Sequence, residues 1–231
     1  MVELTWLGHG TYQIKLESGE VVLVDPWVEG NPAFPTSHAF DRIDVMLISH
    51  GHFDHIHDAV PLAQKHEPQV ICIYEIGQWL EGKGVKNISR MNKGGTQSAG
   101  SVRVTMTHAV HSCGILDEGS IIYGGEAAGY VVHLPDGRRV YCAGDTNVFS
   151  DMALIRELYR PELALLPVGD LFTMGPQEAA KACSLLGCEQ VIPLHFGTFP
   201  ALTGTPSELG KLIEGSATRL WELQPGQPVE W

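Results

Sequence analysis

The sequence predicts an α/β protein in which two β-sheets pack face to face and helices cover their outer faces. Two observations lead to this prediction. The first strands follow one another as hairpins, later strands alternate with helices, and this order recurs in two rough halves of the chain. The 231 residues are 44% hydrophobic, which is enough for one substantial core. We therefore expect a single domain over residues 1–231.

The first half of the chain begins with strands. Residues 3–7 lead into a histidine between two glycines, and residues 12–17 alternate between apolar and polar side chains, as in a half-buried strand. After a Ser-Gly-Glu turn, the apolar run at 21–24 predicts a buried strand. Residues 26–42 are rich in Pro, Gly and Asn, and they predict a long loop of the kind that often borders a site.

Strands then alternate with helices. Apolar runs predict strands at 45–48 and 70–74, with a helix over 57–66 between them and a second helix that ends at Gly82. Residues 91–100 predict a glycine-rich connector.

The second half repeats this rhythm. Alternation over 102–106 predicts a strand, and the sequence Pro-Asp-Gly predicts the turn of a hairpin between 130–134 and 139–143. The remaining expected elements are helices at 151–160, from Pro176 and from about Ser207, and buried strands at 163–167 and 191–194.

Composition argues against several classes of partner. The formal net charge is −12 and the 15 Lys and Arg residues are scattered, which argues against a nucleic-acid partner, although a single cleft can be basic on an acidic protein. The chain shows no signal peptide, and no apolar run approaches the roughly 20 residues that would span a membrane. Five cysteines without CxxC spacing read as core residues and favour a cytoplasmic location. We expect a small-molecule substrate, and a homo-oligomer stays open.

The stretch SHGHFDH concentrates the residues with metal-binding chemistry. His50, His52, Asp54 and His55 form an HxHxDH pattern directly after the apolar run at 45–48. Zinc and similar cations bind imidazole nitrogen and carboxylate oxygen at about 2.0–2.2 Å, so a tight loop after a buried strand suits a metal site. The alternative is a polar turn of solvated histidines, and the pattern favours the metal site.

Further ligand-type residues also follow predicted strands. Asp25, His50, Asp145 and His195 each come just after an apolar run, and His111 closes a similar segment. Sites in sheet proteins gather at strand ends, where loops converge over a rigid scaffold. These side chains could therefore meet around two ions.

This order of residues resembles the ligand pattern of the metallo-β-lactamase superfamily, and it is closest to that superfamily's small, largely uncharacterised metal-dependent hydrolases. The segments TWLGH at 5–9, VDP at 24–26, AGDT at 143–146, FTM at 172–174 and HFGTFP at 195–200 look like signatures of that family. The similarity runs over nearly the whole chain. It implies a four-layer αββα sandwich of the metallo-β-lactamase type, and it says little about the substrate.

The resemblance also implies two divalent metal ions per chain. One would be held by His50, His52 and His111 and the other by Asp54, His55 and His195, with Asp145 bridging. Zinc is the expected ion, and Mn, Fe or Co would suit the same His and Asp ligands.

The expected chemistry follows from these ligands. A water that bridges two cations is acidified and becomes a hydroxide nucleophile, while the metals polarise the substrate oxygen. We expect Asp54 to orient or deprotonate that water and His9 to protonate the leaving group; a hydrogen-bonded structural histidine is the alternative for His9. Asp25 and Asp58 are candidates to accept the second N–H of a ligating histidine, and ordinary strand-end or helix-start carboxylates are the alternative.

Several residues are harder to place. His57 and Cys113 stand where glycine and serine are common in the family. We expect His57 on the helix after the metal loop and Cys113 as a packing residue; the alternatives are a His57 that touches the site and a Cys113 thiol near the metals. His108 competes with His111 as a ligand, and the family pattern favours His111. Asp170 would either line the site entrance or be a solvated loop carboxylate. No context supports a site role for His38, His66 or His133.

The sequence therefore predicts a metal-dependent hydrolase acting on phosphodiesters, esters or lactones, in that order of preference by analogy with the superfamily. One alternative is a di-iron oxidoreductase on the same fold, although such proteins typically carry glutamate where His52 stands, together with a flavin domain. The other is a non-catalytic metal-binding scaffold, although such scaffolds usually lose ligands.

Overall fold

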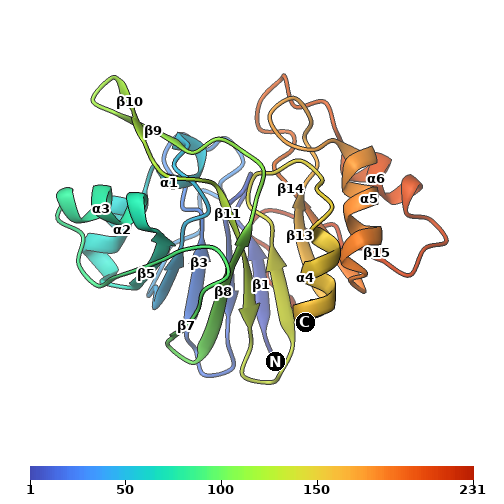
Figure 1. The fold of residues 1–231 in the computed structure, drawn as a ribbon, viewed down its shortest axis with the longest axis horizontal. Coiled ribbons are helices and arrows are strands. Elements are labelled where there is room, and N and C mark those ends of the chain that lie inside the picture. Colours follow the sequence, from blue (N-terminus) through green and yellow to red (C-terminus); the bar gives the residue numbers. More distant parts are fainter.

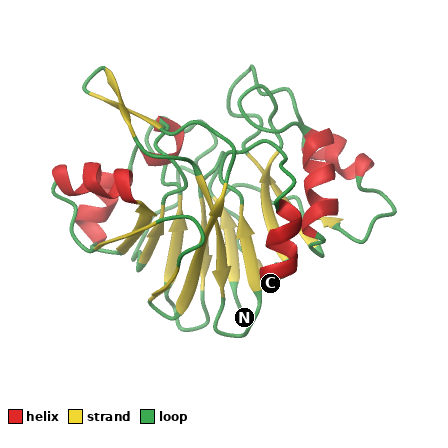
Figure 2. Cartoon of the chain, viewed as in Figure 1, coloured by secondary structure: helices red, strands yellow, loops and turns green.

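Two seven-stranded sheets lie face to face between outer helices in the computed structural model, which describes residues 1–231. Helices flank the strands on both sides (Figure 2). The predicted four-layer αββα arrangement is confirmed.

The first sheet comes from the first half of the chain, apart from one short C-terminal strand. Strands β1 to β3 are antiparallel neighbours, and β3 to β6 are parallel. In sheet order the strands are β16 (Val229–Glu230), β1 (Glu3–Trp6), β2 (Tyr12–Lys15), β3 (Val21–Val24), β4 (Val45–Leu47), β5 (Gln69–Ile73) and β6 (Ile88–Met91). The helices of this half are α1 (Phe53–Ile56), α2 (Ala59–His66) and α3 (Tyr74–Gly82).

The second sheet comes from the rest of the chain. In sheet order its strands are β15 (Arg219–Leu220), β14 (Gln190–Leu194), β13 (Leu163–Pro167), β12 (Arg139–Cys142), β11 (Ala128–His133), β8 (Val102–His108) and β7 (Thr96–Ala99). Its helices are α4 (Met152–Tyr159), α5 (Pro176–Leu186) and α6 (Pro206–Leu212). A separate hairpin of β9 (Gly114–Asp117) and β10 (Ser120–Tyr123) projects from one end of the molecule (Figure 1).

Alternation along the strands of the second sheet explains why both of its faces are covered. Tyr130 and Val132 of β11 belong to a core of 44 buried residues that fills the space between the sheets. Val131, between them, belongs to a second core of 17 residues shared with α4, α5 and α6. Successive side chains of a strand point to opposite faces, so one apolar run serves two layers.

Most of the predicted elements are present. The hairpin of β11 and β12 turns at Gly137, whose φ of 93° suits glycine, and α5 begins with Pro176 at its first position as expected. The connector prediction for 91–100 is wrong in part, because it contains the end of β6 and all of β7. β7 is the edge strand TQSA, whose mostly polar side chains give no apolar alternation to detect.

Within each sheet, the strands that precede the candidate ligands run in the same direction, so their C-terminal ends lie at the same end of the sheet. β1 and β3 both run antiparallel to β2, and β4 runs parallel to β3, so β1, β3 and β4 share a direction. In the second sheet β8 and β12 both run antiparallel to β11, and β14 follows the direction of β12 through β13.

Hydrogen bonds between the sheets join these strand ends. The Ala128 amide donates to the Ser49 carbonyl at 2.9 Å, and the His195 amide donates to the His9 carbonyl at 3.1 Å. The fully buried Tyr130 hydroxyl donates to the Ile48 carbonyl at 2.6 Å. The two sets of loops are therefore fixed relative to each other.

No helix is both long and apolar enough to cross a membrane. All five cysteines are buried and unpaired, which agrees with their interpretation as core residues.

Replacing Tyr130 by Phe removes a buried donor and leaves the Ile48 carbonyl without this partner. We expect the free energy of unfolding to fall by about 1–2 kcal/mol, measured by urea denaturation. Tyr123→Phe is the matched control because that side chain is 75% exposed, and it should change stability little. Equal effects of the two substitutions would contradict the role given to the Tyr130 bond.

Candidate metal centre

Three histidines from two distant segments form the first part of the centre. His50 and His52 follow β4, and His111 follows β8. The His52 Nδ1 atom lies 3.1 Å from His50 Nε2 and 3.2 Å from His111 Nε2. Three imidazole nitrogens this close together could all bind one cation.

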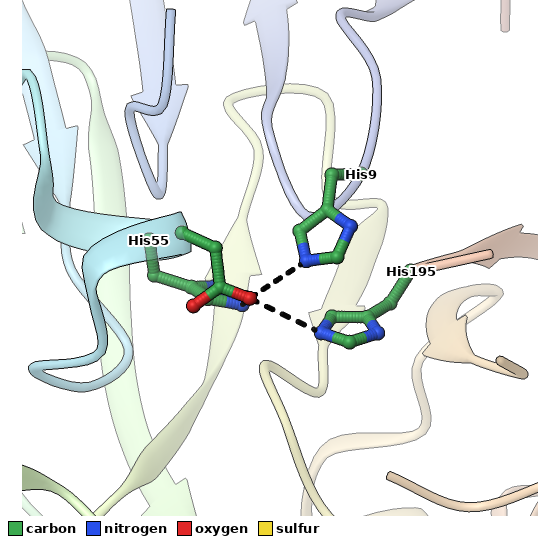
Figure 3. Close-up of side chains that lie close together, drawn as sticks. His9, His55 and His195 are labelled. Atoms are coloured by element: carbon green, nitrogen blue, oxygen red, sulfur yellow. Dashed lines mark hydrogen bonds and ion pairs between the residues drawn. The ribbon is translucent and has the colours of Figure 1, made fainter. Parts of the chain in front are cut away.

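The second part adds a carboxylate from α1. Asp54 Oδ2 lies 4.0 Å from His55 Nε2 and 3.7 Å from His195 Nε2. Figure 3 shows the rings of His9 and His195 directed at one carboxylate oxygen, with His55 beside it. His9, Asp54, His55 and His195 are all buried and close enough to share an ion.

Asp145, which follows β12, lies between the two parts. Its Oδ2 atom is 3.7 Å from both His50 Nε2 and His111 Nε2, and 3.1 Å from His195 Nε2. Its Oδ1 atom is 3.3 Å from His55 Nε2. One carboxylate therefore faces histidines of both groups.

The buried nitrogens fit a metal better than a hydrogen-bond network. His55 Nε2 and His195 Nε2 are buried and make no hydrogen bond, although the Asp145 carboxylate is near. Burial opposes protonation, but Asp145 raises the pKa of His55 well above its usual value and that of His195 to about 9. A metal ion would take the place of these protons, because ligating imidazoles must be neutral.

Asp25 holds two of the histidine rings in place. Its Oδ2 atom accepts a hydrogen bond from His55 Nδ1 at 2.8 Å and another from the Ser49 hydroxyl at 2.6 Å. Ser49 Oγ in turn lies 2.9 Å from His50 Nδ1. The opposite nitrogen of each ring is thereby directed into the cluster, which is the usual arrangement around a metal-binding histidine.

Left-handed backbone conformations shape these strand ends. His9, Asp25 and His195 have φ values of 54°, 48° and 56°, although none is a glycine. Such conformations cost of order 1–3 kcal/mol each and persist where surrounding contacts impose them. Here they turn the chain abruptly after β1, β3 and β14, so that each residue lies at the centre.

His9 is fully buried and has partners for both ring nitrogens. Nε2 lies 2.9 Å from Asp54 Oδ2, and Nδ1 lies 2.8 Å from the Thr198 hydroxyl. Burial lowers the pKa of His9 to about 4 even though Asp54 opposes the shift. A neutral ring would donate from Nε2 to Asp54 and accept at Nδ1 from Thr198. This geometry suits orientation of Asp54, and donation to a leaving group would require His9 to give up the Asp54 bond.

Other candidate residues lie apart from the cluster. His108 contacts the Lys93 ammonium at 3.1 Å, whereas His111 joins the first group of ligands. Asp58 accepts hydrogen bonds from the amides of Val28 and Glu29 and supports no candidate ligand. His38, His66 and His133 belong to no candidate metal group.

Three remaining residues also have local roles. His57 is half exposed in the turn between α1 and α2, where its ring meets Asp58, so the prediction that it lies on a helix is wrong. Asp170 is an exposed carboxylate that accepts from the next amide. Cys113 is buried, its thiol contacts the Gly124 carbonyl, and burial raises its pKa to about 11, as expected for an inert packing residue.

The sequence did not predict a role for two residues that contact the cluster, Ser49 and Thr198. Ser49 precedes His50 directly, and Thr198 lies in the segment HFGTFP. Ser49 is adjacent to a candidate ligand and Thr198 lies in a segment that resembles a family signature, but hydroxyl groups are common in loops and neither position indicates a specific contact.

Comparisons with known proteins agree with this geometry. The pattern of a beta-lactamase superfamily domain matches residues 20–196. A UPF0173 metal-dependent hydrolase of Solibacter usitatus is 64% identical over 230 residues and covers 100% of both chains. The structure of Igni18, a novel metallo hydrolase from Ignicoccus hospitalis, matches with a TM-score of 0.85 at 30% identity, covering 100% of this chain and 99% of that one.

A more distant likeness concerns the fold alone. CmlA, a diiron β-hydroxylase from Streptomyces venezuelae, matches with a TM-score of 0.76 at 16% identity and covers 100% of this chain and 54% of its own.

Asp25→Asn should weaken zinc binding by about 10- to 100-fold. In the wild type, the Ser49 amide donates to one carboxylate oxygen of Asp25, and the Ser49 hydroxyl and His55 Nδ1 donate to the other. An asparagine side chain has only one oxygen to accept these bonds. Competition with a chromophoric chelator measures this change. Asp170→Asn makes the same substitution on an exposed loop and should leave the affinity unchanged. Wild-type affinity in Asp25→Asn would contradict the supporting role.

The roles of His108, the last residue of β8, and His111, which follows the strand, can be distinguished by metal content. His111→Ala should lose one ion per chain after zinc loading, whereas His108→Ala should retain both. Elemental analysis by mass spectrometry after gel filtration gives the stoichiometry. Loss of an ion from His108→Ala would show that the ligand assignment is reversed.

Proposed function

The chain belongs to the beta-lactamase superfamily and, within it, to the UPF0173 metal-dependent hydrolases, and from this we propose that it hydrolyses a small phosphodiester, ester or lactone at a dinuclear metal centre. The position of Asp145 carries the proposal. Its carboxylate lies between 3.1 and 3.7 Å from four histidines that belong to two groups. A side chain placed in this way is suited to join two ions.

Each ion would have its own set of protein ligands. His50, His52 and His111 would hold one, and Asp54, His55 and His195 would hold the other, with Asp145 shared. Imidazole and carboxylate ligands favour zinc and also accept Mn, Fe or Co. Such cations, when bound, lower the pKa of water toward neutrality and polarise the substrate oxygen.

The protein supplies orientation and proton transfer. A cleft opens onto the His and Asp cluster, and Asp54 is one of its lining residues. Burial raises the pKa of Asp54, but nearby His195 and His9 outweigh this effect and hold the pKa well below its usual range. Its carboxylate therefore stays ionised and can accept a hydrogen bond that orients the attacking water. His9 keeps that carboxylate in place from behind, and Thr198 fixes the His9 ring. We propose that Asp54 orients or deprotonates the attacking water and that His9 positions Asp54, while proton donation by His9 to the leaving group stays a prediction.

Neither alternative function has an observation in its favour. The match to CmlA is a likeness of fold, and His52 stands where di-iron oxidoreductases typically carry glutamate. A non-catalytic scaffold would be expected to have lost some of the metal ligands. In this chain all seven candidate ligands lie close together: His50, His52, Asp54, His55, His111, Asp145 and His195.

Asp145→Ala should abolish hydrolysis that depends on added metal, with a loss greater than the roughly 100-fold typical of residues that only support a ligand. Turnover is measured on a panel of phosphodiesters, esters and lactones after chelation and restoration of Zn, Mn, Fe or Co. Asp151→Ala, an exposed carboxylate before α4, is the control. Circular dichroism establishes that both variants are folded, and full turnover in Asp145→Ala would overturn the proposal.

A further inference from the structure

The cleft above the cluster has two chemically different parts. Its volume is about 760 Å³, and its base includes cluster residues such as Asp54, Asp145 and His195. The other lining residues are Ser112, Gly114 and five apolar side chains, Phe53, Leu116, Ile121, Phe172 and Phe199. The proposed function uses the base of the cleft and leaves these walls unexplained.

The hairpin of β9 and β10 supplies one wall. Leu116 and Ile121 are directly paired across the two strands, so their side chains lie on the same face, and both line the cleft. They are 61% and 79% exposed. Ile115, on the opposite face, is 1% exposed and anchors the hairpin to the core. The hairpin projects from the end of the molecule opposite the two termini (Figure 1).

Aromatic residues supply the rest of the wall. Phe172 follows two left-handed residues in the loop after β13 and is 57% exposed. Phe199 and Phe53 lie 6.4 Å apart, and both pack against the buried Trp27 ring with centroids at 5.7 Å. These ring contacts place Phe53 and Phe199 in the wall of the cleft that Asp54 also lines.

The charged residues that line the cleft argue against a substrate with additional phosphate groups. The lining contains no Lys or Arg, and its carboxylates are Asp54 and Asp145. Recognition of phosphate groups away from the reacting centre would favour such cations. Exposed apolar side chains that border a site with a few convergent polar groups are instead typical of a pocket for an apolar ligand.

We propose that, given the hydrolytic function proposed above, the substrate is an uncharged carboxylic ester or lactone whose apolar chain lies between the β9–β10 hairpin and Phe172. Water forms a bond to the carbonyl carbon, and the bond from that carbon to the alkoxy oxygen breaks. One water proton goes to the alkoxy oxygen, giving an alcohol and a carboxylic acid, which then ionises. The apolar walls bind the chain, and the carbonyl group reaches the His and Asp cluster.

Chain length is the variable that tests this assignment. Zinc-loaded protein is titrated calorimetrically with 2-alkanones from four to ten carbons, in which a methylene replaces the ester oxygen and nothing can be hydrolysed. Affinity should rise about threefold to fourfold for each added methylene until the cleft is full. kcat/KM for 4-nitrophenyl esters and for alkyl-substituted γ-lactones should rise in parallel, and the two series distinguish open from cyclic substrates.

Matched variants locate the binding wall. Leu116→Ser combined with Ile121→Ser should lower kcat/KM for the longest ester at least tenfold, lower it far less for the acetate ester, which has no alkyl chain for the wall to bind, and leave the zinc content unchanged. Leu158→Ser is the control, because that leucine is 66% exposed on α4 and does not line the cleft.

The outcomes separate the two proposals. Faster hydrolysis of bis(4-nitrophenyl) phosphate than of every ester and lactone would overturn the substrate class and leave the hydrolase intact. Affinity and kcat/KM that do not change with chain length, or a hairpin variant that keeps the wild-type slope, would also overturn it. No metal-dependent turnover on any substrate would overturn both, whereas chain-length dependence that is lost in the hairpin variant supports the assignment.

Discussion

The centre depends on one buried carboxylate held among imidazoles. Asp145 is 3% exposed and faces histidines from the ends of β4, β8 and β14 and from α1. A buried charge is costly unless it is paired or binds a metal, so the surrounding rings are part of what keeps it there. The two sheets must bring their strand ends together for this pairing to exist, and the layer arrangement therefore serves the site directly.

Rigid support follows from the same strand ends. Asp25 holds His55 directly and His50 through Ser49, while backbone hydrogen bonds from Ala128 and His195 cross between the sheets. The nitrogens of the candidate ligands are thus oriented by buried groups at the strand ends. Positions that must be accurate for chemistry are in this way tied to the most buried parts of the chain.

In the function proposed here, substrate binding and chemistry would use different parts of the structure. The His and Asp residues lie at buried strand ends, whereas Leu116, Ile121 and Phe172 lie on an exposed hairpin and a surface loop. Loops and hairpins tolerate change more readily than buried strand ends. Under that proposal, a pattern of His and Asp residues at buried strand ends would indicate the metal centre and say little about the substrate.

The sequence by itself determined the strand and helix order, the HxHxDH segment and the strand-end positions of Asp25, Asp145 and His195, because apolar periodicity and motif spacing are local properties. The sequence did not predict the edge strand β7, whose side chains are mostly polar and show no apolar alternation. It also did not predict the β9–β10 hairpin, which lines the cleft. Only the tertiary structure showed that Asp25 supports His55 while Asp58 supports no candidate ligand. Only it showed that His9 contacts Thr198, 189 residues away. Such contacts depend on which strand ends meet when two sheets pack, and no local pattern in the chain encodes that choice.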